Sequence, residues 1–328
     1  MEDIRIYDTD FNLCHIEHNV ISSNWTVYFN SVGNFEIHTL ANTETAEIIL
    51  RQMDISENRL PIIVQGDLQG VVTGVRLSND FAIYGRTLNW FLARKIVPKF
   101  ISSDLPVVCN PEDISNYLVS QAFSDQENFV TGDKVGLSDI DTFWRNTYNP
   151  LNEVVSDVLA TQNAGHKVFF DLKNKCWVFE ILPPTESQIL LSEANLNAFE
   201  SEYTYSIDGY CSACWYEQEQ DFVNGEFPEP VWTKLVKDKK VGIFGSEYVA
   251  SATVESEAKS LLDAKKVKSE IVTGVNGLLF GEDFGLGDIL RVQFVKGKIA
   301  RTEWKQIFGV NLGWENGAES REIILKNI

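Results

Sequence analysis

The chain has 328 residues, 44% of them hydrophobic, and this length predicts two or three domains with buried cores. Its 47 acidic residues outnumber the 28 basic ones, and a net charge of −19 argues against a surface that binds nucleic acid by neutralising phosphates. The opening MEDIRIYDTD lacks the basic and apolar parts of a signal peptide, and no apolar run is long enough to span a bilayer. We therefore expect a chain made in the cytoplasm that stays there or leaves by lysis or assembly.

The first hundred residues predict β structure. Alternating apolar residues flank the turns at 8–12 and 30–34, so we expect two hairpins there. A short helix fits Thr43–Gln52, with Asn42 or Thr43 as the cap and acids in the first turn. Further strands are expected at 60–64, 70–77 and 81–85, followed by one or two helical turns at 88–95.

The middle of the chain predicts two helices and a hairpin. Asn110-Pro111 followed by two acids is a helix start, and Asn149-Pro150 repeats the device. Gly165 is expected to end the second helix. Apolar strands at 166–172 and 176–182 then form a hairpin.

The last third predicts a linker followed by strands with one inserted helix. Pro183-Pro184 and the polar run after it are typical of a linker. The segment 202–217 is aromatic and strand-like. A helix fits 254–268 with three inward residues: Ala258, Leu261 and Leu262. The remaining strands are expected at 288–294, 299–308 and 321–325.

The stretch Gly281-Glu-Asp-Phe-Gly-Leu-Gly-Asp-Ile289 raises the question of a ligand loop. A dinucleotide fold needs a helix after the glycines, whereas here a strand follows. The acids would repel phosphate, and they lack the alternating spacing of a calcium loop. We therefore predict a structural turn, in which Gly285 and Gly287 permit positive φ and Asp288 closes the turn. The predicted turn residues are Gly281, Asp283, Gly285, Gly287 and Asp288.

Two other motifs favour structural interpretations. The segment 8–12 has three ligand positions of a calcium loop, but Leu13 replaces the required glycine and Asn19 the closing glutamate. Cys211-Ser-Ala-Cys214 lies in the aromatic segment, not at a helix start, and a zinc site would need a second pair. The five cysteines are odd in number and scattered, which indicates reduced thiols: Cys14, Cys109, Cys176, Cys211 and Cys214.

No catalytic constellation emerges from the residues. GxSxG is absent, and the four histidines have no recognisable partner motif. Carboxylate pairs such as Glu217 with Glu219, and Glu282 with Asp283, are expected by chance in so acidic a chain. We accordingly predict no catalytic residues, no cofactor and no metal ligand, and a protein that is not an enzyme.

Four local patterns, in order, resemble the tail hub proteins of long-tailed phages. Trp25, Tyr28 and the run from Gly33 through Phe35 resemble a signature near the start of that family. The run Ile83-Tyr-Gly85-Arg86 and the leucines after it resemble a second. The helix and hairpin between 152 and 181 resemble its central unit, and the 281–289 turn resembles one near its C-terminus. The chain departs from the pattern at 217–230 and 124–138.

The resemblance extends to the baseplate hub of contractile phages and to the N-terminal part of tail-associated lysins. It implies an α+β, mainly β fold in which two β-barrel, tube-like domains flank an α+β domain. The expected boundaries are 1–98 for the first barrel, 99–195 for the middle domain and 196–328 for the second barrel, with an inserted helix near 254–268. The family-signature residues would be Trp25, Gly33, Phe35, Gly85 and Arg86.

The resemblance also implies a structural role in the virion. Three copies would form a pseudo-six-fold ring at the tail tip that caps and continues the tail tube. The implied partners are the distal tail protein, the tape measure protein and a tail-tip or fibre protein. DNA would pass through an acidic lumen without stable binding during ejection, and assembly would occur in the host cytoplasm.

Two other classes of function stay open from the residues alone. One is a carbohydrate- or receptor-binding β module of a phage tail, with exposed aromatic residues of the 203–216 segment as its surface. The other is a cryptic cell-wall hydrolase that uses a carboxylate pair. A ring-shaped trimer would favour the hub over both.

Overall fold

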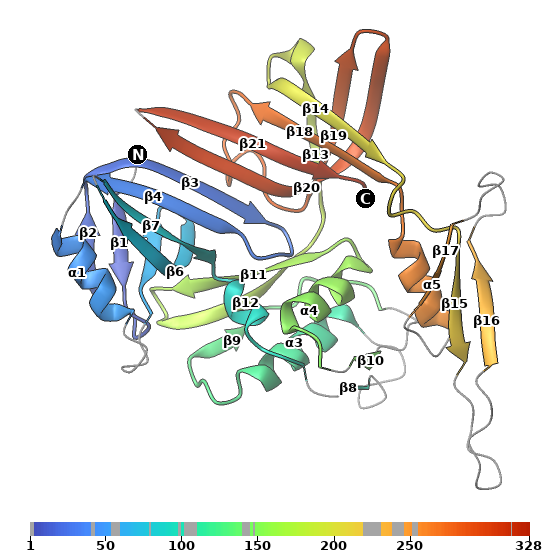
Figure 1. Ribbon diagram of the computed structural model, residues 1–328, viewed down its shortest axis with the longest axis horizontal. Helices are drawn as coiled ribbons and strands as arrows, with labels where there is room; N and C mark the ends of the chain where they lie inside the picture. The colour runs from blue at the N-terminus through green and yellow to red at the C-terminus, as the bar shows by residue number, and fades with distance from the viewer. Residues whose placement is uncertain are drawn as a thin grey trace, which may run out of the picture.

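The computed structural model describes residues 3–40, 43–53, 60–78, 80–97, 100–101, 110–139, 145–146, 148–218, 231–237, 246–250, 255–315 and 317–328. Strands dominate it, and thirteen of them belong to one large sheet. Figure 1 shows the N-terminal and C-terminal β regions that form this sheet, a mixed middle region, and a small separate sheet.

The N-terminal β region is a curled antiparallel sheet with the strand order β3-β4-β7-β6-β5-β1-β2. Both predicted hairpins form, since β1 pairs with β2 and β3 with β4. The helix α1 (Thr43–Gln52) has the predicted bounds. The strands are β1 (Ile4–Tyr7), β2 (Leu13–Glu17), β3 (Val20–Tyr28), β4 (Asn34–Leu40), β5 (Ile62–Gln65), β6 (Leu68–Leu77) and β7 (Asp80–Thr87).

Two separate cores cover the two faces of this sheet. One face packs inward around Trp25, Phe35 and Ile37 together with Ile49 of α1. The other face contributes Tyr7 and further residues to a core shared with the middle of the chain. All four residues of β5 are consequently buried, which explains why its first three residues are consecutive apolar ones and do not alternate with polar ones.

The middle region packs two helices against a small sheet of β11, β12 and β9. Asn110 caps α3 as predicted, because its side chain accepts a hydrogen bond from the Glu112 backbone N–H. The elements are α2 (Trp90–Ala93), β8 (Phe100–Ile101), α3 (Pro111–Ala122), β9 (Phe129–Thr131), β10 (Arg145–Asn146), α4 (Leu151–Ala160), β11 (Gly165–Asp171) and β12 (Cys176–Leu182).

Two details of the α4 prediction are wrong. Pro150 is itself the N-cap of α4, and no side-chain hydrogen bond caps the helix there. The arrangement of α3, in which an asparagine caps the helix and a proline is its first residue, is therefore not repeated. Gly165 does not end the helix: α4 stops at Ala160, and Gly165 is the first residue of β11. A glycine is needed there because a Cβ would lie 2.3 Å from the backbone oxygen of Phe29.

The C-terminal β region is a second curled sheet with the order β13-β19-β20-β21-β18-β14. The polar run after Pro184 is therefore not a linker, because it forms β13, which pairs in parallel with β19. The strands are β13 (Thr185–Ser192), β14 (Ala198–Ser206), β18 (Lys268–Val275), β19 (Asp288–Lys296), β20 (Ile299–Glu315) and β21 (Ala318–Lys326), and the 3-10 helix η3 (Glu193–Asn195) follows β13.

The 17-residue strand β20 joins the two β regions. Up to Gln306 it pairs with β19, and from Gly309 to Glu315 it pairs with β3. The exchange occurs at Phe308, whose backbone oxygen accepts a hydrogen bond from Phe29 N. The described strands therefore run as one open path from β14 to β2 and close no barrel, which differs from the two separate barrels expected.

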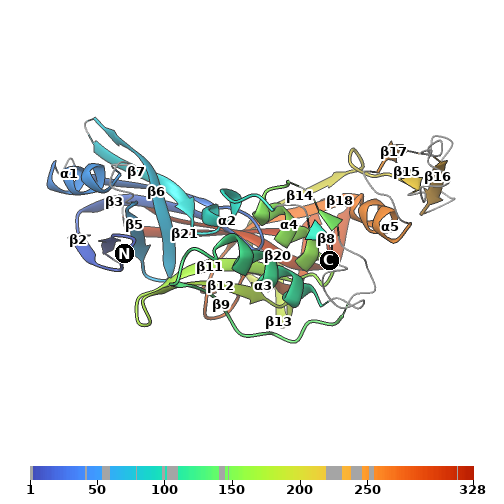
Figure 2. The same ribbon diagram turned by 90° about the horizontal axis from the view of Figure 1, so that it is seen from below.

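A third sheet lies apart from the other regions. It consists of β16 (Val231–Val236), β15 (Ala213–Gln218) and β17 (Glu247–Val249), with α5 (Glu255–Ala264) on one face. Figures 1 and 2 place it at the opposite end of the molecule from α1. The aromatic segment predicted as one strand is thus two strands in different sheets. Ala258 and Leu262 face inward as expected, but Leu261 is 38% exposed.

Candidate functional site

The first signature segment forms the interior of the N-terminal region. Trp25 on β3 stacks on Phe35 of β4, with ring centroids 4.4 Å apart, and its indole N–H donates to Gln65 Oε1 at 2.8 Å. Gly85 on β7 lies opposite Phe35 in the register. A Cβ on Gly85 would lie 2.0 Å from the backbone oxygen of Val71, so no larger residue fits.

The other two signature residues, Gly33 and Arg86, lie at the end of these strands where the β3–β4 turn is. A Cβ on Gly33 would lie 1.9 Å from the backbone oxygen of Thr26, which makes glycine necessary where the β3–β4 turn closes. Arg86 pairs with Asn34 in the register of β4 and β7, and its side chain is exposed. The structure thus brings Trp25, Phe35 and Gly85 together, places Gly33 in the β3–β4 turn and leaves Arg86 on the surface.

Three signature segments meet at Phe29, which is 2% exposed. Its backbone N–H donates to Phe308 O at 2.8 Å, and its carbonyl accepts from His166 N at 3.0 Å. Gly165 and Gly287 pack directly against it. We call these five residues the Phe29 junction, because the N-terminal, middle and C-terminal regions all contribute to it.

The turn at residues 281–288, called the glycine turn below, places Gly287 in the Phe29 junction. Gly287 has φ +87°, and a Cβ there would lie 2.2 Å from the Phe29 ring. Gly281 also has φ +87°, whereas Gly285 is not among the glycines with positive φ. Gly287 N donates to Ile307 O at 2.9 Å, which ties the turn to β20.

The acids of the turn accept hydrogen bonds from its own backbone. Asp283 Oδ2 accepts from Leu279 N, and Asp288 Oδ2 accepts from Gly285 N, each at 2.7 Å. Burial raises the pKa of Asp288 above its usual range. Because amide and carboxylate groups pair with one another inside the turn, the loop does not present them to a phosphate or a metal ion.

Buried amide side chains reinforce the junction, and these residues were not predicted. Asn89 donates to Ser31 O at 3.0 Å and accepts from Val168 N at 2.8 Å. Gln306 donates to Asn163 O at 2.8 Å and to Gly287 O at 3.1 Å. Polar residues inside apolar segments were the available signal, since buried amides are retained where backbone groups of neighbouring segments need partners.

His166 is the buried titratable group of the junction. Its Nε2 lies 3.1 Å from Asn152 Oδ1, and its Nδ1 has no hydrogen-bond partner among the described residues. Complete burial lowers its pKa to about 3. The imidazole is therefore neutral at physiological pH, and its position is that of a core residue.

The two cysteines of the CxxC motif are not equivalent. Cys214 is buried in β15 with its Sγ 3.6 Å from Ala258 O, whereas Cys211 is half-buried in the loop before that strand. Burial raises the pKa of Cys214, the opposite of what a redox thiol requires. Cys109 lies outside the described residues.

The remaining candidate clusters also have structural partners. Asp8 Oδ1 accepts from the backbone N–H groups of Asp10 and Asn12, which is a turn and not an empty calcium loop. Glu219 of the first carboxylate pair lies outside the described residues. Across the described part of the chain, no group of three or more His, Cys, Asp or Glu residues could hold a metal ion.

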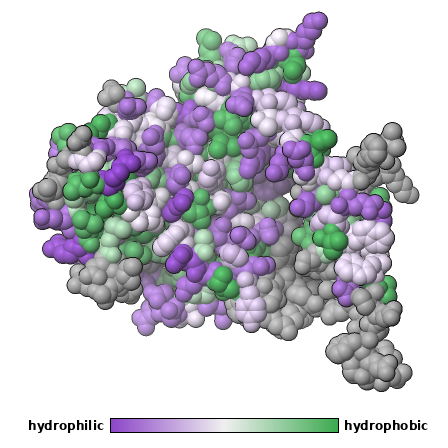
Figure 3. Space-filling view, in the orientation of Figure 1, coloured by the Kyte–Doolittle hydropathy of each residue, from purple (hydrophilic) through white to green (hydrophobic). Residues whose placement is uncertain are grey.

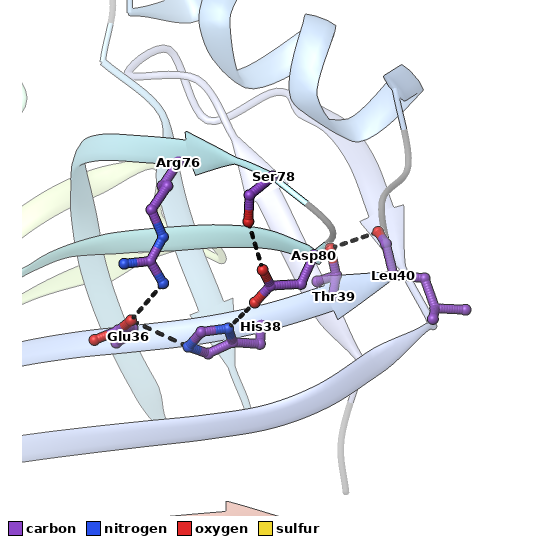
Figure 4. A network of polar contacts seen from close by, with 7 residues as sticks. All are labelled: Glu36, His38, Thr39, Leu40, Arg76, Ser78 and Asp80. Atoms are coloured by element: carbon purple, nitrogen blue, oxygen red, sulfur yellow. Dashed lines mark hydrogen bonds and ion pairs between the residues drawn. The ribbon is translucent and has the colours of Figure 1, made fainter.

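A charged network covers the outer face of β4, β6 and β7 (Figure 4). His38 lies between two carboxylates, with Nε2 3.0 Å from Glu36 and Nδ1 2.5 Å from Asp80. Arg76 lies 3.7 Å from Glu36, and Ser78 donates to Asp80 at 2.9 Å. The hydrogen bond from His38 holds the pKa of Asp80 below its usual range. Each acid has a partner, so the network is a polar surface and not a catalytic pair.

Known proteins match this chain in sequence over part of its length and in fold over nearly all of it. Residues 87–227 match the family model described as Siphovirus ReqiPepy6 Gp37-like protein. The fold is similar to the 43 kDa tail protein of prophage MuSo2 from Shewanella oneidensis, with a TM-score of 0.62 and 11% identity over 99% of this chain and 98% of that one. The chain therefore has the fold of these phage tail proteins, and its residues 87–227 match a siphovirus protein family.

Two other solved structures are also similar to this chain. The tail protein from Neisseria meningitidis MC58 has a TM-score of 0.59 and 11% identity, covering 99% of this chain and 96% of that one. A chain of the Francisella PdpA-VgrG complex has a TM-score of 0.52 and 10% identity, covering 99% of this chain and 52% of that one. No curated protein matches the sequence. The chain therefore shares its fold with phage tail proteins and with a chain of the PdpA-VgrG complex.

The small sheet exposes aromatic residues. On the face opposite α5, Trp215 and Trp232 are 37% and 47% exposed. Trp215 is held by Glu247, which accepts from its indole N–H at 2.9 Å, and by the ammonium of Lys234 over its ring. In Figure 3 this part of the surface mixes pale and green side chains with purple ones. None of the described helices is long and apolar enough to cross a membrane.

Proposed function

We propose that this chain is a phage tail protein that serves as a hub of the tail tip or baseplate. Three copies form a ring that caps the tail tube and connects it to tail-tip or fibre proteins. The two β regions of each chain act as the two tube-like units, which gives six units around the ring. Residues 1–98 and 196–328, together with β13, would form these units, and the rest of the α+β domain at 99–195 would lie outside.

The observation that carries this proposal is the pairing of β20 with β3. It fuses two curled sheets of one chain into a single body with open ends at β14 and β2. A barrel closed on itself removes its edges, whereas an open sheet leaves strand edges for further contacts. Two such units held at a fixed angle are what a six-unit ring of three chains requires.

The partners follow from the position at the tip. The ring would contact the distal tail protein above and tail-tip or fibre proteins below, and the tape measure protein would lie inside it. DNA would pass through during ejection without stable binding, because the excess of acids repels the phosphate backbone over roughly 10 Å at about 0.1 M salt. Assembly would take place in the host cytoplasm before the virion is released.

Oligomeric state is the first test. Light scattering should give three times the chain mass of 37.1 kDa, and negative-stain images should show rings. The same preparation should show no measurable affinity for double-stranded DNA at about 0.15 M salt. A monomer at high protein concentration, or a trimer whose channel is lined by Lys and Arg, would contradict the hub.

A carbohydrate- or receptor-binding β module is the second candidate, and the exposed Trp215 and Trp232 favour it. Sugar binding by a monomer, lost on Trp232→Ala, would support this candidate over the hub. The hydrolase has less support, because Asp283 of its described carboxylate pair is engaged in a turn. Turnover of cell-wall polymer by the purified chain would revive it.

A further inference from the structure

A lysine lies inside the core of the C-terminal β region. Lys305 on β20 is fully buried, at 0% exposure, on the face of the strand that also carries Ile307. Lysine is almost never fully buried unless it is paired, because removing an ammonium from water is costly. The groups that surround its Nζ are therefore informative.

Four polar atoms surround that amine. Nζ lies 2.7 Å from Ser269 Oγ and 3.1 Å from Ser269 O. It lies 2.5 Å from Asn327 Oδ1 and 2.9 Å from Glu303 Oε2. Glu303 is two residues before Lys305 and shares its face, and it is 31% exposed.

The strand register fixes this arrangement. Gln306 pairs with Lys326 on β21, and Lys326 pairs with Glu270 on β18. The next row of the same sheet therefore carries Lys305, Asn327 and Ser269 side by side, on strands that Figure 1 shows as neighbours. The side chains meet because of backbone pairing and not through a flexible loop.

Three of these side chains supply the parts of an amide-forming reaction. Lys305 supplies an amine as nucleophile, Asn327 a side-chain amide as electrophile, and Glu303 a carboxylate as base. An amine becomes a competent nucleophile when an adjacent base removes its proton. Fixing the amine against the amide replaces a bimolecular encounter, which corresponds to effective concentrations of about 10⁵ M or more. We propose that Lys305 and Asn327 form an intramolecular isopeptide bond, with Glu303 as the proton-transfer group.

The step balances without an oxidant, a reductant or a cofactor. Glu303 takes a proton from the Lys305 ammonium, and the neutral Nζ attacks the Asn327 side-chain carbonyl carbon. The new Nζ–carbon amide bond forms, and the bond from that carbon to Nδ2 breaks. Nδ2 takes one proton from Nζ and leaves as ammonia, which then accepts the proton held by Glu303 and departs as ammonium, so that the carboxylate is restored. Asn327 is exposed, so the ammonia has a direct route to solvent.

The product also removes a buried charge. The amide that replaces the ammonium is neutral and needs only ordinary hydrogen bonds, which Ser269 can supply. The bond would fix the end of β21 to β20 covalently, between two strands that belong to the strand path joining the β regions. The inference is independent of the hub proposal, because it requires only the fold of one chain.

Mass spectrometry tests the bond directly. The intact mass of the folded, purified chain should be lower than the sequence mass by one ammonia. Trypsin should fail to cleave after Lys305, and one cross-linked product should join residues 302–321 to the segment that begins at Asn327. A folded wild-type chain with the full sequence mass, cleaved normally after Lys305, would overturn the proposal.

Variants separate chemistry from folding. Lys305→Met and Asn327→Ala should restore the unmodified mass, and Glu303→Gln should do so while circular dichroism shows a folded protein. Lys326→Met is the matched control, because Lys326 lies over the Phe308 ring and not among the reacting groups. It should keep the loss of ammonia. If Asn327→Ala still lacks the mass of one ammonia, Asn327 is not the electrophile. If Glu303→Gln still lacks that mass, Glu303 is not the proton-transfer group.

Discussion

The Phe29 junction and the outer face of the small sheet are built in opposite ways. At the junction, β3, β11, β20 and the glycine turn approach so closely that glycine is needed at two positions. On the small sheet, α5 covers one face and two tryptophans remain exposed on the other. The junction is complete within one chain, whereas the small sheet has aromatic area that the described residues leave exposed.

The difference separates residues that hold the fold from residues available to partners. A close-packed interior loses stability when a few atoms are added, because neighbouring groups cannot move away. Exposed aromatic side chains contribute little to the fold but are frequent where protein surfaces bind. Substitutions at the two places should therefore differ in size and in kind.

The largest effect is expected at Gly287. Gly287→Ala should lower the free energy of unfolding by about 3 kcal/mol, because an alanine must adopt positive φ and its Cβ would overlap the buried Phe29 ring. Urea unfolding followed by tryptophan fluorescence measures the change. The matched control is Gly285→Ala in the same turn, where the nearest atom to a Cβ is 3.9 Å away. It should stay within about 0.5 kcal/mol of wild type. If Gly287→Ala changed the free energy of unfolding as little as Gly285→Ala, the junction would not be close-packed around Gly287.

His166 gives the junction a dependence on pH. The pKa of its imidazole is about 3 in the folded chain, whereas an unperturbed histidine, as in the unfolded chain, has a pKa of 6.5. The unfolded chain therefore takes up a proton first as the pH falls. The stability present above pH 6.5 is therefore lost progressively towards pH 3. Between pH 7.5 and 5 the contribution of this group should fall by about 2 kcal/mol. Urea titrations at both values, compared with His166→Gln, isolate that contribution. An equal fall in the variant would assign the loss to other groups.

Local patterns in the sequence predicted most of the elements. The two N-terminal hairpins, α1 and the cap at Asn110 follow from residue type and spacing alone. The glycine turn was predicted as a turn, but its reason was not: Gly287 is needed chiefly because Phe29 lies against it. That contact joins residues far apart in sequence, so no local pattern could reveal it.

The errors have the same origin. β13 is polar and follows two prolines, and it becomes a strand only because β19 pairs with it. Gly165 was interpreted as a helix end, although the backbone of Phe29 determines its identity. The exchange of partners along β20 could not be predicted either, since it depends on which strands lie beside it. Long-range packing decided each of these positions.

The two cysteines should show a smaller version of the same contrast. Cys214→Ala should cost about 1 kcal/mol, because it leaves a small cavity beneath α5. Cys211→Ala, in the half-buried loop, should remain within about 0.5 kcal/mol of wild type. The double variant should stay folded, and metal analysis of the wild type should find no stoichiometric zinc. One zinc per chain would replace the structural interpretation of these thiols with a metal site.

The smallest effect on stability is expected on the outer face of the small sheet. Trp232→Ala should change the free energy of unfolding by no more than about 0.5 kcal/mol, because the side chain is 47% exposed. Tyr216→Ala is the matched control on the neighbouring strand: its side chain is 3% exposed against α5, and its loss should cost about 3 kcal/mol. Hydrogen exchange of β15 should accordingly accelerate in Tyr216→Ala and not in Trp232→Ala. If the exposed face serves assembly, Trp232→Ala should still weaken the binding of other tail components, measured by co-sedimentation of purified proteins. A Trp232→Ala chain as unstable as Tyr216→Ala would mean that the fold itself depends on this face, and the contrast with the Phe29 junction would be lost.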